Sequence, residues 1–238
     1  MDNAIYATLT RQSGLMNELQ MVANNIANAN TAGFKAEGMM FSEFVADLGP
    51  DDDSLSMAAG RIKLTDQTQG VLAQTGGAFD VAIEGDGYFL IDTPQGQRLT
   101  RAGNFTPNAA GELVTMDGNR VLDAGGAPVF VPTGAGAVGI AADGTISAGG
   151  TAVGQIGVVV PNDPLDLRRQ GGTLFEAATG FGPAPRPQVL QGFVEGSNVN
   201  PIAQVSRMIE VQRAYEMGQS FLETEDNRIR GVIQAISR

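Results

Sequence analysis

Apolar residues recur at coiled-coil spacing near both ends of this chain. Near the start, steps of four and three residues place one stripe on a single helix face, with one polar member: Ile5, Leu9, Gln12, Met16, Leu19, Ala23 and Ile26. Near the end, apolar side chains recur every seven residues at Met208, Tyr215, Leu222, Ile229 and Ile236. The pattern predicts one long helix at each end of the chain.

Capping residues set the limits of these helices. Asn200 is a preferred cap and Pro201 is favoured at the first helical position, so the last helix should begin there. Asn28, Asn30 and Gly33 should end the first helix, because asparagine and glycine tolerate left-handed conformations and asparagine competes for backbone hydrogen bonds. The first helix is therefore expected over about residues 2–28.

The middle of the chain has a different pattern. Short β-rich runs lie between Gly, Asp, Asn and Pro from about Thr65 to Glu195, at the spacing of hairpins in a barrel or sandwich. Residues 36–64 have no clear period and are expected to form a linker, with one short helix around Phe41, Phe44, Val45 and Leu48. Residues 161–187 are interrupted by prolines and are expected to be irregular.

These elements predict an α+β fold in which the two terminal helices pack as a coiled-coil-like layer beside a Gly-rich, all-β middle domain. The expected division is an N-terminal assembly helix with its following segment over 1–35, a linker over 36–64, the β domain over 65–195 and a C-terminal assembly helix over 196–238.

The net charge of the chain resides in its middle. Residues 1–35 and 196–238 are each neutral, so residues 36–195 carry the whole net charge of −11. An acidic body disfavours nucleic acid, since phosphate binding needs clustered Lys and Arg. No apolar run reaches the length of a membrane span, and the polar start does not resemble a cleavable secretory signal. We therefore expect no nucleic-acid partner, no direct membrane insertion and export by another route.

Catalytic and cofactor chemistry has weak support. The chain has no Cys and no His, which removes thiolate chemistry and the commonest general base and metal ligand. The run Gly134 to Gly139 fits GxGxxG, but a turn and a probable strand follow it where a phosphate site needs a helix. Asp51, Asp52 and Asp53 lack the alternation of a calcium loop. We expect no cofactor and no metal.

A carboxylate-based hydrolase is a further alternative, for which Glu84 and Asp86 would be the nearest acidic pair. Glycosidase chemistry needs two carboxyl groups at a set separation across a sugar. Proximity in the sequence establishes no such geometry, and both residues flank a turn. We therefore expect a protein that is not an enzyme.

The terminal stripes allow two interpretations. The two helices could pack on each other as an antiparallel hairpin within one subunit. However, Val211, Val232 and Ile233 add apolar groups on further flanks of the last helix, which a single partner helix would leave uncovered. Gln212, Gln219 and Asp226 also recur every seven residues beside the stripe, and such a polar seam would seal a simple dimer poorly. Neighbouring molecules would cover the remaining faces.

Three segments of the chain carry a family resemblance. The first contains Ala23-Asn24-Asn25-Ile26-Ala27-Asn28, Asn30-Thr31 and Gly33-Phe34-Lys35. The second contains Thr68-Gln69-Gly70, Asp80-Val81-Ala82-Ile83, Gly87-Tyr88-Phe89 and Thr100-Arg101-Ala102-Gly103. The third contains Gly192-Phe193-Val194-Glu195-Gly196-Ser197-Asn198-Val199-Asn200-Pro201 and the run from Met208 to Glu216. In this order they resemble bacterial flagellar basal-body rod and hook proteins, and the opening Met1-Asp2-Asn3-Ala4-Ile5-Tyr6 together with the short length most resembles the subunits of the proximal rod.

The resemblance implies a structural subunit of the flagellar basal body that polymerises through its terminal helices into a hollow axial structure and transmits torque. Its implied partners are other rod subunits, copies of itself and the flagellar type III export apparatus, which it would pass without a cleaved signal. The chain has Gly218-Gln219-Ser220 where the family typically has Asn-x-Lys. Expected assembly residues are Ile5, Leu9, Met16, Leu19, Ile26, Asn28, Phe34, Met208, Tyr215, Leu222, Ile229, Ile233 and Ile236.

Two alternatives within the structural class stay open at this point. The chain could be a distal-rod or hook-type axial subunit, or a secreted β-rich adhesin or binding module with a helical stalk. Incorporation into a rod together with other rod subunits would distinguish an axial subunit from the adhesin.

Overall fold

The computed structural model describes residues 2–46, 55–132, 134 and 136–236, of which 2–6, 41–46 and 55–62 are described as backbone only. The chain forms two compact units. The helical unit contains residues 2–27, 37–46, 55–64 and 200–236, and the β unit contains residues 28–36 and 65–199. The calcium alternative at Asp51, Asp52 and Asp53 lies outside the described residues.

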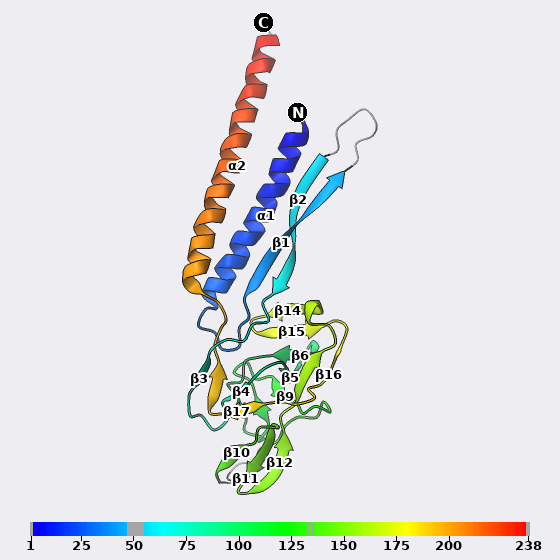
Figure 1. Ribbon diagram of the computed structural model, residues 1–238, viewed down its shortest axis with the longest axis vertical. Helices are drawn as coiled ribbons and strands as arrows, with labels where there is room; N and C mark the ends of the chain where they lie inside the picture. Colours follow the sequence, from blue (N-terminus) through cyan, green and yellow to red (C-terminus); the bar gives the residue numbers. More distant parts are fainter. Residues whose placement is uncertain (1, 47–54, 133, 135, 237–238) are drawn as a thin grey trace. The chain divides into compact units, whose positions relative to one another are not determined.

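The helical unit consists of two helices and a hairpin. Helix α1 runs over Asp2–Ala27 and α2 over Pro201–Ile236, and the two lie antiparallel (Figure 1). Strands β1 (Glu37–Ala46) and β2 (Leu55–Thr65) pair with each other, and β1 contacts α1. Figure 1 shows α2 continuing past the first turn of α1. Both terminal helices are therefore confirmed, and they contact each other within one subunit.

The expected start of the last helix is confirmed in atomic detail. Asn200 Oδ1 accepts a hydrogen bond of 3.1 Å from the backbone N–H of Ala203, which has no partner inside the helix. Pro201 occupies the first helical position, where its missing N–H costs nothing. At the other end of the protein, α1 stops at Ala27, one residue before the expected Asn28.

The expectation of a short helix within residues 36–64 is wrong in the described part of that range. Residues 37–46 and 55–65 are long strands instead. Phe41, Phe44 and Val45 stand at helical spacing, but aromatic and β-branched residues also favour strands. A short apolar run cannot be assigned by its period alone, and here the pairing of two strands decided the conformation.

The β unit is built almost entirely from short antiparallel strands. Among the described residues its largest sheet has nine strands, and smaller sheets pair β10 with β11 and β12, β4 with β17, and β3 with β18. The strands are β3 (Leu72–Gln74), β4 (Val81–Ile83), β5 (Tyr88–Thr93), β6 (Gly96–Thr100), β7 (Thr106–Pro107), β8 (Leu113–Val114), β9 (Arg120–Val121), β10 (Val138–Ile140), β11 (Thr145–Ala148), β12 (Thr151–Gln155), β13 (Val158–Pro161), β14 (Leu167–Gly171), β15 (Leu174–Ala177), β16 (Phe181–Pro183), β17 (Val189–Gln191) and β18 (Phe193–Glu195).

Strand β5 is the centre of the large sheet. It pairs with β6, β9 and β13, and its side chains alternate between two apolar clusters. Phe89 and Ile91 belong to the larger cluster, whereas Tyr88 and Leu90 belong to the smaller one. This follows from the period of two in a strand, and burial on both faces explains why residues 88–91 are apolar without interruption.

The expectation of irregular structure over residues 161–187 is wrong for most of that range. A short 3₁₀ turn, Pro164–Asp166, leads into the hairpin of β14 and β15, and β16 pairs with β13. The prolines stand at the ends of these elements and in turns, where they remove no ladder hydrogen bond from the middle of a strand.

The GxGxxG run does not lead into a helix. Residues 138–140 form strand β10, so the helix N-terminus that a dinucleotide site requires is absent from the described residues that follow it. Within the same described ranges, no helix is both long enough and apolar enough to span a membrane. The coarse fold expectation, α+β with a helix at each end and a β-rich middle, is confirmed.

Candidate assembly surface

Polar contacts join α1 and α2 along their length. Asn25 lies at one end of the contact, where its side-chain N–H donates to Gln204 Oε1 at 3.3 Å. In the middle, Arg207 forms an ion pair with Glu18 Oε1 at 2.6 Å. From one contact to the next, the α1 residue comes earlier in the chain and the α2 residue comes later. This order is that of an antiparallel helix pair. The intramolecular hairpin foreseen from the sequence is therefore present in the helical unit.

Asn25 also connects α1 to the hairpin. Its side chain accepts from the backbone N–H of Glu37 at 3.0 Å and donates to the Glu37 carbonyl at 2.8 Å. One amide side chain thus satisfies both backbone groups of a strand residue, as a neighbouring strand would. Asn25 is 1% exposed. These hydrogen bonds explain why a polar side chain is tolerated at this point of the buried face of α1.

The buried face of α1 differs from the expected stripe. Leu15, Met21 and Val22 are buried, together with Glu18 and Asn25. These positions precede the expected stripe by about one residue, which turns the buried face by about 100° on a helix. Inside the subunit, contacts with α2 and β1 decide which face is covered, and this information is not local to α1.

The expected assembly residues on α1 are largely left uncovered by the subunit. Leu9 and Met16 are exposed, and Leu19 and Ile26 are half-buried. Ile5 lies in the part of α1 that is described as backbone only. A role of these side chains in contacts between subunits stays a prediction.

Two other expected assembly residues lie in the β unit. Asn28 is half-buried in a turn, where its carbonyl and side-chain oxygen accept from Thr31. Phe34 is only 1% exposed. The ring is thus enclosed by residues of its own chain, and a role of Phe34 in contacts between subunits stays a prediction.

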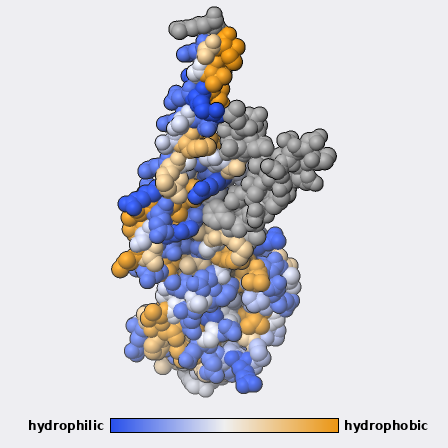
Figure 2. Space-filling model, turned by 45° about the horizontal axis from the view of Figure 1, so that its top comes forward, coloured by the Kyte–Doolittle hydropathy of each residue, from blue (hydrophilic) through white to orange (hydrophobic). Residues whose placement is uncertain are grey.

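The expected stripe on α2 divides into two parts. Met208, Tyr215 and Leu222 are half-buried, in the part of α2 that contacts α1. Farther along, apolar side chains are exposed: Ile229 by 41%, Val232 by 52%, Ile233 by 61% and Ile236 by 80%. We call these four residues the α2 end. Figure 2 shows apolar side chains gathered at this extremity of the helix.

A groove runs between the two helices along one flank. One part, about 330 Å³ in volume, is lined by Leu15, Met217, Gly218 and Phe221 among others. A second part, about 350 Å³, includes Glu18 and Arg207 and shares Arg11, Leu15 and Ala214 with the first. We call the two parts together the Gly218 groove.

Gly218 lets the helices approach each other closely. A Cβ at this position would lie 3.2 Å from Gln12 Nε2, which is tighter than an ordinary contact. The Gln12 amide also donates a long hydrogen bond of 3.4 Å to the carbonyl of Tyr215. The polar member of the α1 stripe thus packs against a glycine, at the place where this chain departs from the family's usual Asn-x-Lys.

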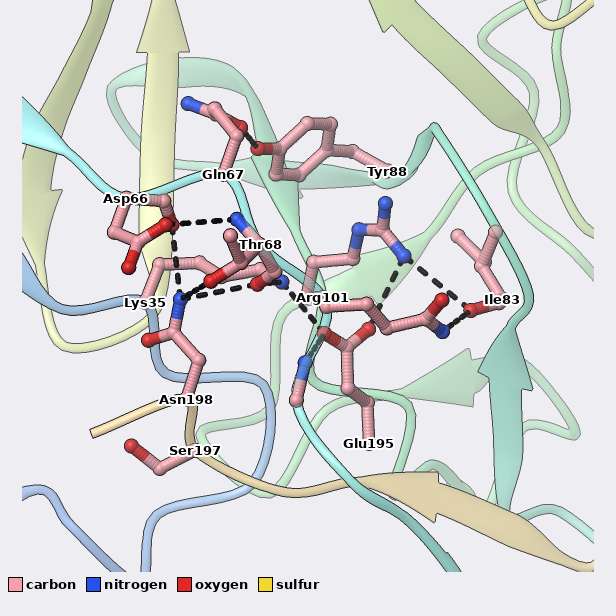
Figure 3. Close-up of polar contacts among 12 residues, drawn as sticks. Lys35, Asp66, Gln67, Thr68, Ile83, Tyr88, Arg101, Glu195, Ser197 and Asn198 are labelled. Carbon is pink, nitrogen blue, oxygen red and sulfur yellow. Dashed lines mark hydrogen bonds and ion pairs between the residues drawn. The ribbon is translucent and has the colours of Figure 1, made fainter. Parts of the chain in front are cut away.

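In the β unit, a buried charge cluster ties together the two segments through which the chain enters and leaves (Figure 3). Lys35 Nζ lies 2.6 Å from Glu195 Oε1, and Arg101 Nη1 lies 3.1 Å from Glu195 Oε2. All three side chains are at most 4% exposed. A carboxylate between two cations is compensated, which is the condition for burying such charges.

Backbone groups complete the charge cluster. Lys35 Nζ also donates to the Thr68 carbonyl at 2.7 Å, and Glu195 Oε1 accepts from the Gly70 N–H at 3.0 Å. Arg101 donates to the Gly85 carbonyl at 2.6 Å. Burial lowers the pKa of Lys35, and the hydrogen bond to Glu195 opposes that effect.

Aromatic rings lie beside two cations of this region, Arg169 and Arg101. The Arg169 guanidinium lies 4.3 Å from the ring centre of Phe34 and 4.7 Å from that of Phe175, and it donates to the Lys35 carbonyl. Arg101 lies 5.2 Å from the ring centre of Tyr88. Burial raises the pKa of Tyr88 to about 12, and its hydroxyl donates to Gln67.

Asn198 lies in the segment through which the chain leaves the β unit, and it binds two other segments of that unit. Its side-chain oxygen accepts from the Ala36 N–H at 2.6 Å, and its side-chain N–H donates to the carbonyls of Asp66 and Thr68 at 3.0 Å each. In the sequence, Lys35, Arg101, Glu195 and Asn198 stand out only as parts of the family resemblance. Four charged or polar residues far apart in sequence give no local signal that they meet.

No group of three or more acidic residues in the described part of the chain could hold a metal ion. Glu84 and Asp86, the pair considered for hydrolysis, are both exposed on the turn between β4 and β5. A helix pair with an uncovered apolar end, carried by the same chain as a β unit with compensated internal charges, defines a structural assembly subunit.

Comparison with known proteins identifies the family. Residues 5–35 match the description "Flagella basal body rod protein", residues 82–148 match "Flagellar hook protein FlgE/F/G D1 domain" and residues 190–235 match "Flagellar basal body rod FlgEFG protein C-terminal". The flagellar basal-body rod protein FlgF of Caulobacter vibrioides is 39% identical, with 100% of this chain and 99% of the relative aligned. FlgF of Rhizobium meliloti is 36% identical over 99% and 98%, and FlgG of Bacillus subtilis is 31% identical over 97% of each.

The chain therefore belongs to the flagellar basal-body rod protein family, and within it the chain is FlgF-like. It is a structural rod subunit of the bacterial flagellar basal body, and the family is not a class of enzymes. The alternative of a secreted adhesin is wrong, because the similarity to rod proteins extends over the whole chain.

Proposed function

We propose that this chain is a subunit of the proximal rod and that its terminal helices polymerise, as a coiled-coil-like layer, into a hollow axial structure that transmits torque. The observation that carries the proposal is the exposed α2 end, which is 41–80% exposed at four apolar residues. Exposed apolar groups that follow one another on a helix mark an interaction surface. Contacts that do not close into a ring propagate as a helical assembly.

The proximal position has support from the relatives. FlgF of Caulobacter vibrioides and of Rhizobium meliloti are 39% and 36% identical to this chain, against 31% for FlgG of Bacillus subtilis. A distal-rod or hook-type position is the alternative. Placing the chain in a map of an assembled basal body would distinguish the two positions.

The proposed partners are other rod subunits, copies of this chain and the flagellar type III export apparatus. We propose that export uses no cleaved signal. The support for the rod partners is that the family matches cover both terminal segments, over residues 5–35 and 190–235.

Deleting residues 229–238 tests the function in a flagellated strain that depends on this chain for its rod. We expect the β unit to stay folded and rod incorporation to be lost, because the apolar contacts of the α2 end are gone. A matched control replaces exposed polar residues of the same helix, Glu223→Ala with Asn227→Ala, and should assemble normally. Basal bodies containing the truncated chain at the normal level would contradict the proposal.

A further inference from the structure

We propose that the free edge of strand β3 is a docking site for an extended segment of a different protein, uncharged over the paired residues and basic at its ends. Strand β3 pairs only with β18 among the described strands, and Figure 1 shows it at the margin of the β unit. A segment that adds to such an edge continues the sheet through its main chain. This site belongs to the β unit alone and goes beyond the proposed role of the terminal helices.

The ladder between β3 and β18 is one residue longer at each end than the two strands. The N–H of Gly196 donates to the Val71 carbonyl at 2.8 Å, and the N–H of Thr75 donates to the Gly192 carbonyl at 2.8 Å. Opposed residues of an antiparallel pair alternate between hydrogen-bonded and non-hydrogen-bonded pairs. The odd-numbered residues of 71–75 therefore direct their backbone groups toward β18.

Leu72 and Gln74 direct their backbone groups to the free edge. They lie opposite Glu195 and Phe193, at the non-hydrogen-bonded positions of the same ladder. The Glu195 carbonyl agrees with this geometry, because it accepts from the N–H of Gly33 at 2.7 Å instead of from β3. Two N–H and two carbonyl groups of β3 thus face outward, and a further strand is the partner that satisfies all four together.

The β3 edge lacks the features that normally prevent strand addition. Natural edge strands are protected by charged side chains, prolines or bulges. Residues 67–79 contain no charged residue and no proline, and the register between β3 and β18 is regular. Val71 is 79% exposed, and Ala73 on the same face is exposed as well. Side chains of a docked strand would cover both.

Four other edge strands of the described β unit differ from β3. Strand β7 contains Pro107 and β16 contains Pro183, while β14 carries two adjacent arginines. In β12, a Cβ at Gly154 would lie 3.7 Å from the Val129 side chain, so a neighbouring segment already lies against that strand. Each of these edges has a protection that β3 lacks.

Charge complementarity favours a basic partner over a second copy of this chain. The β unit contains 13 acidic and 7 basic residues, a net charge of −6. Residues 64–97 contain no Lys or Arg, whereas Asp66 and Asp80 flank the β3 edge in sequence. Asp80 Oδ2 accepts from the Thr75 hydroxyl at 2.6 Å, which holds this carboxylate beside the last paired residue. A second copy would bring like charges to the edge, but Lys or Arg at the ends of a docked segment would be attracted.

A short synthetic peptide of alternating Val and Thr, with lysines at both ends, is the probe. Added to the purified full chain, it should slow hydrogen exchange of the Leu72 and Gln74 amides at least about tenfold. The amides of Ala73 and Thr75, which already face β18, should change little. Absence of this alternating pattern would overturn the inference.

Two matched peptides test the main chain and the charge separately. N-methylation of the valines removes backbone donors, and glutamates in place of the lysines reverse the charge. Each peptide should bind the chain at least about tenfold more weakly than the original. Equal binding of either peptide would contradict the proposed partner. Protection of Leu72 and Gln74 that grows with the concentration of the chain alone would assign the edge to a second copy and overturn the inference.

A proline at the edge provides an independent test. Gln74→Pro removes an outward N–H but no hydrogen bond to β18, so the β unit should stay folded while peptide binding falls at least about tenfold. Gln74→Ala is the matched control, because it keeps the N–H and should bind the peptide normally. Unchanged binding by Gln74→Pro would contradict docking at this edge. If that variant does not fold, the exchange pattern of the unsubstituted chain still decides.

The chain has no cysteine, so Gln74→Cys labelled with a photoreactive maleimide reports the occupant in assembled basal bodies. We expect a cross-link to a different protein, mapped by mass spectrometry to an uncharged stretch flanked by Lys or Arg. Gln95→Cys, on the exposed turn between β5 and β6, is the control and should not give this product. A cross-link to a second copy, or none specific to position 74 in assembled rods, would overturn the inference. Failure of the unsubstituted chain to enter the rod would overturn only the proposed function, because the peptide measurements use the purified chain.

Discussion

Lys35 and Glu195 form an ion pair of 2.6 Å although 160 residues separate them in the sequence, and neither side chain is more than 1% exposed. Lys35 lies in the first segment of the β unit, residues 28–36, and Glu195 ends β18, close to Val199, after which the chain leaves the unit. A single buried contact therefore holds the entry and exit segments together inside the β unit. The contribution of this ion pair to the free energy of unfolding can be measured, and so can those of Tyr88, Asn25 and Gly33.

Removing the carboxylate charge should strongly destabilise the β unit. In Glu195→Gln, Lys35 and Arg101 would stay buried without their counter-charge, and loss of one partner of a buried pair costs about 3–5 kcal/mol. Denaturant unfolding of the purified chain measures the change. Asp92→Asn is the matched control, because its pair with Arg120 is largely exposed and should contribute at most about 1 kcal/mol. Equal losses in the two variants would contradict the assignment.

Ionisation of Tyr88 should make the β unit less stable in alkali. Burial raises its pKa in the folded chain to about 12 from 10.0, so the unfolded chain loses the proton first as the pH rises. The contribution is fully present below pH 10.0 and is lost toward pH 12. We expect the free energy of unfolding to fall by up to about 1.4 kcal/mol per pH unit between about pH 10 and pH 12.

Tyr88→Phe provides the comparison for this pH dependence. The variant loses the hydroxyl that donates to Gln67, so its stability at neutral pH will differ, but its slope against pH should be smaller by one proton. Unfolding measured at about pH 9 and about pH 11 in both chains checks the difference. Parallel pH profiles would show that Tyr88 is not the group responsible.

Loss of the Asn25 side chain should loosen the helical unit. Asn25→Ala removes two hydrogen bonds to the backbone of Glu37, and a hydrogen bond within a protein contributes about 0.5–1.5 kcal/mol to stability. Thermal unfolding followed by helical circular dichroism should show a lower midpoint. Gln20→Ala, on an exposed position of the same helix, should leave the midpoint within a degree or two of the original. A similar shift in both variants would contradict this role.

A side chain at Gly33 should be far more harmful than one at another left-handed glycine. Gly33 has φ +69°, and a Cβ there would lie 2.1 Å from the backbone nitrogen of Ala102. Gly118 has φ +81° with no atom within 4 Å of its Cβ position. We expect Gly118→Ala to cost about 1 kcal/mol and Gly33→Ala about 3 kcal/mol or more, measured by denaturant unfolding. Similar costs would mean that conformation alone, not close approach, requires Gly33.

The elements that depend on local pattern could be predicted from the sequence. Asn200 and Pro201 mark the start of α2 because capping is a matter of adjacent residues. Alternating and turn-rich segments predicted the β unit for the same reason. For residues 37–46 the local pattern was not sufficient. The spacing of Phe41, Phe44 and Val45 is compatible with a helix and with a strand, and pairing with a second strand decides between them.

The candidate site was predictable only in part. The repeat through Met208, Tyr215 and Leu222 indicated which part of α2 has partners, and Ile229 and Ile236 indicated that the repeat continues. Enclosure of Phe34 by Arg169 could not be foreseen, since the two residues come from distant segments. Burial of Glu18 with one unpaired oxygen was equally invisible, because a charged residue on a helix is ordinarily exposed.

The sequence by itself determined the family, the two terminal helices, the β-rich middle and the neutrality of the ends, because periodicity, capping and composition act between neighbouring residues. Only the tertiary structure decided that α1 buries Leu15 and Val22 rather than Met16, and that Lys35 meets Glu195. These outcomes depend on which surfaces of distant segments exclude water together. That is a property of the packed chain, and no short stretch of sequence contains it.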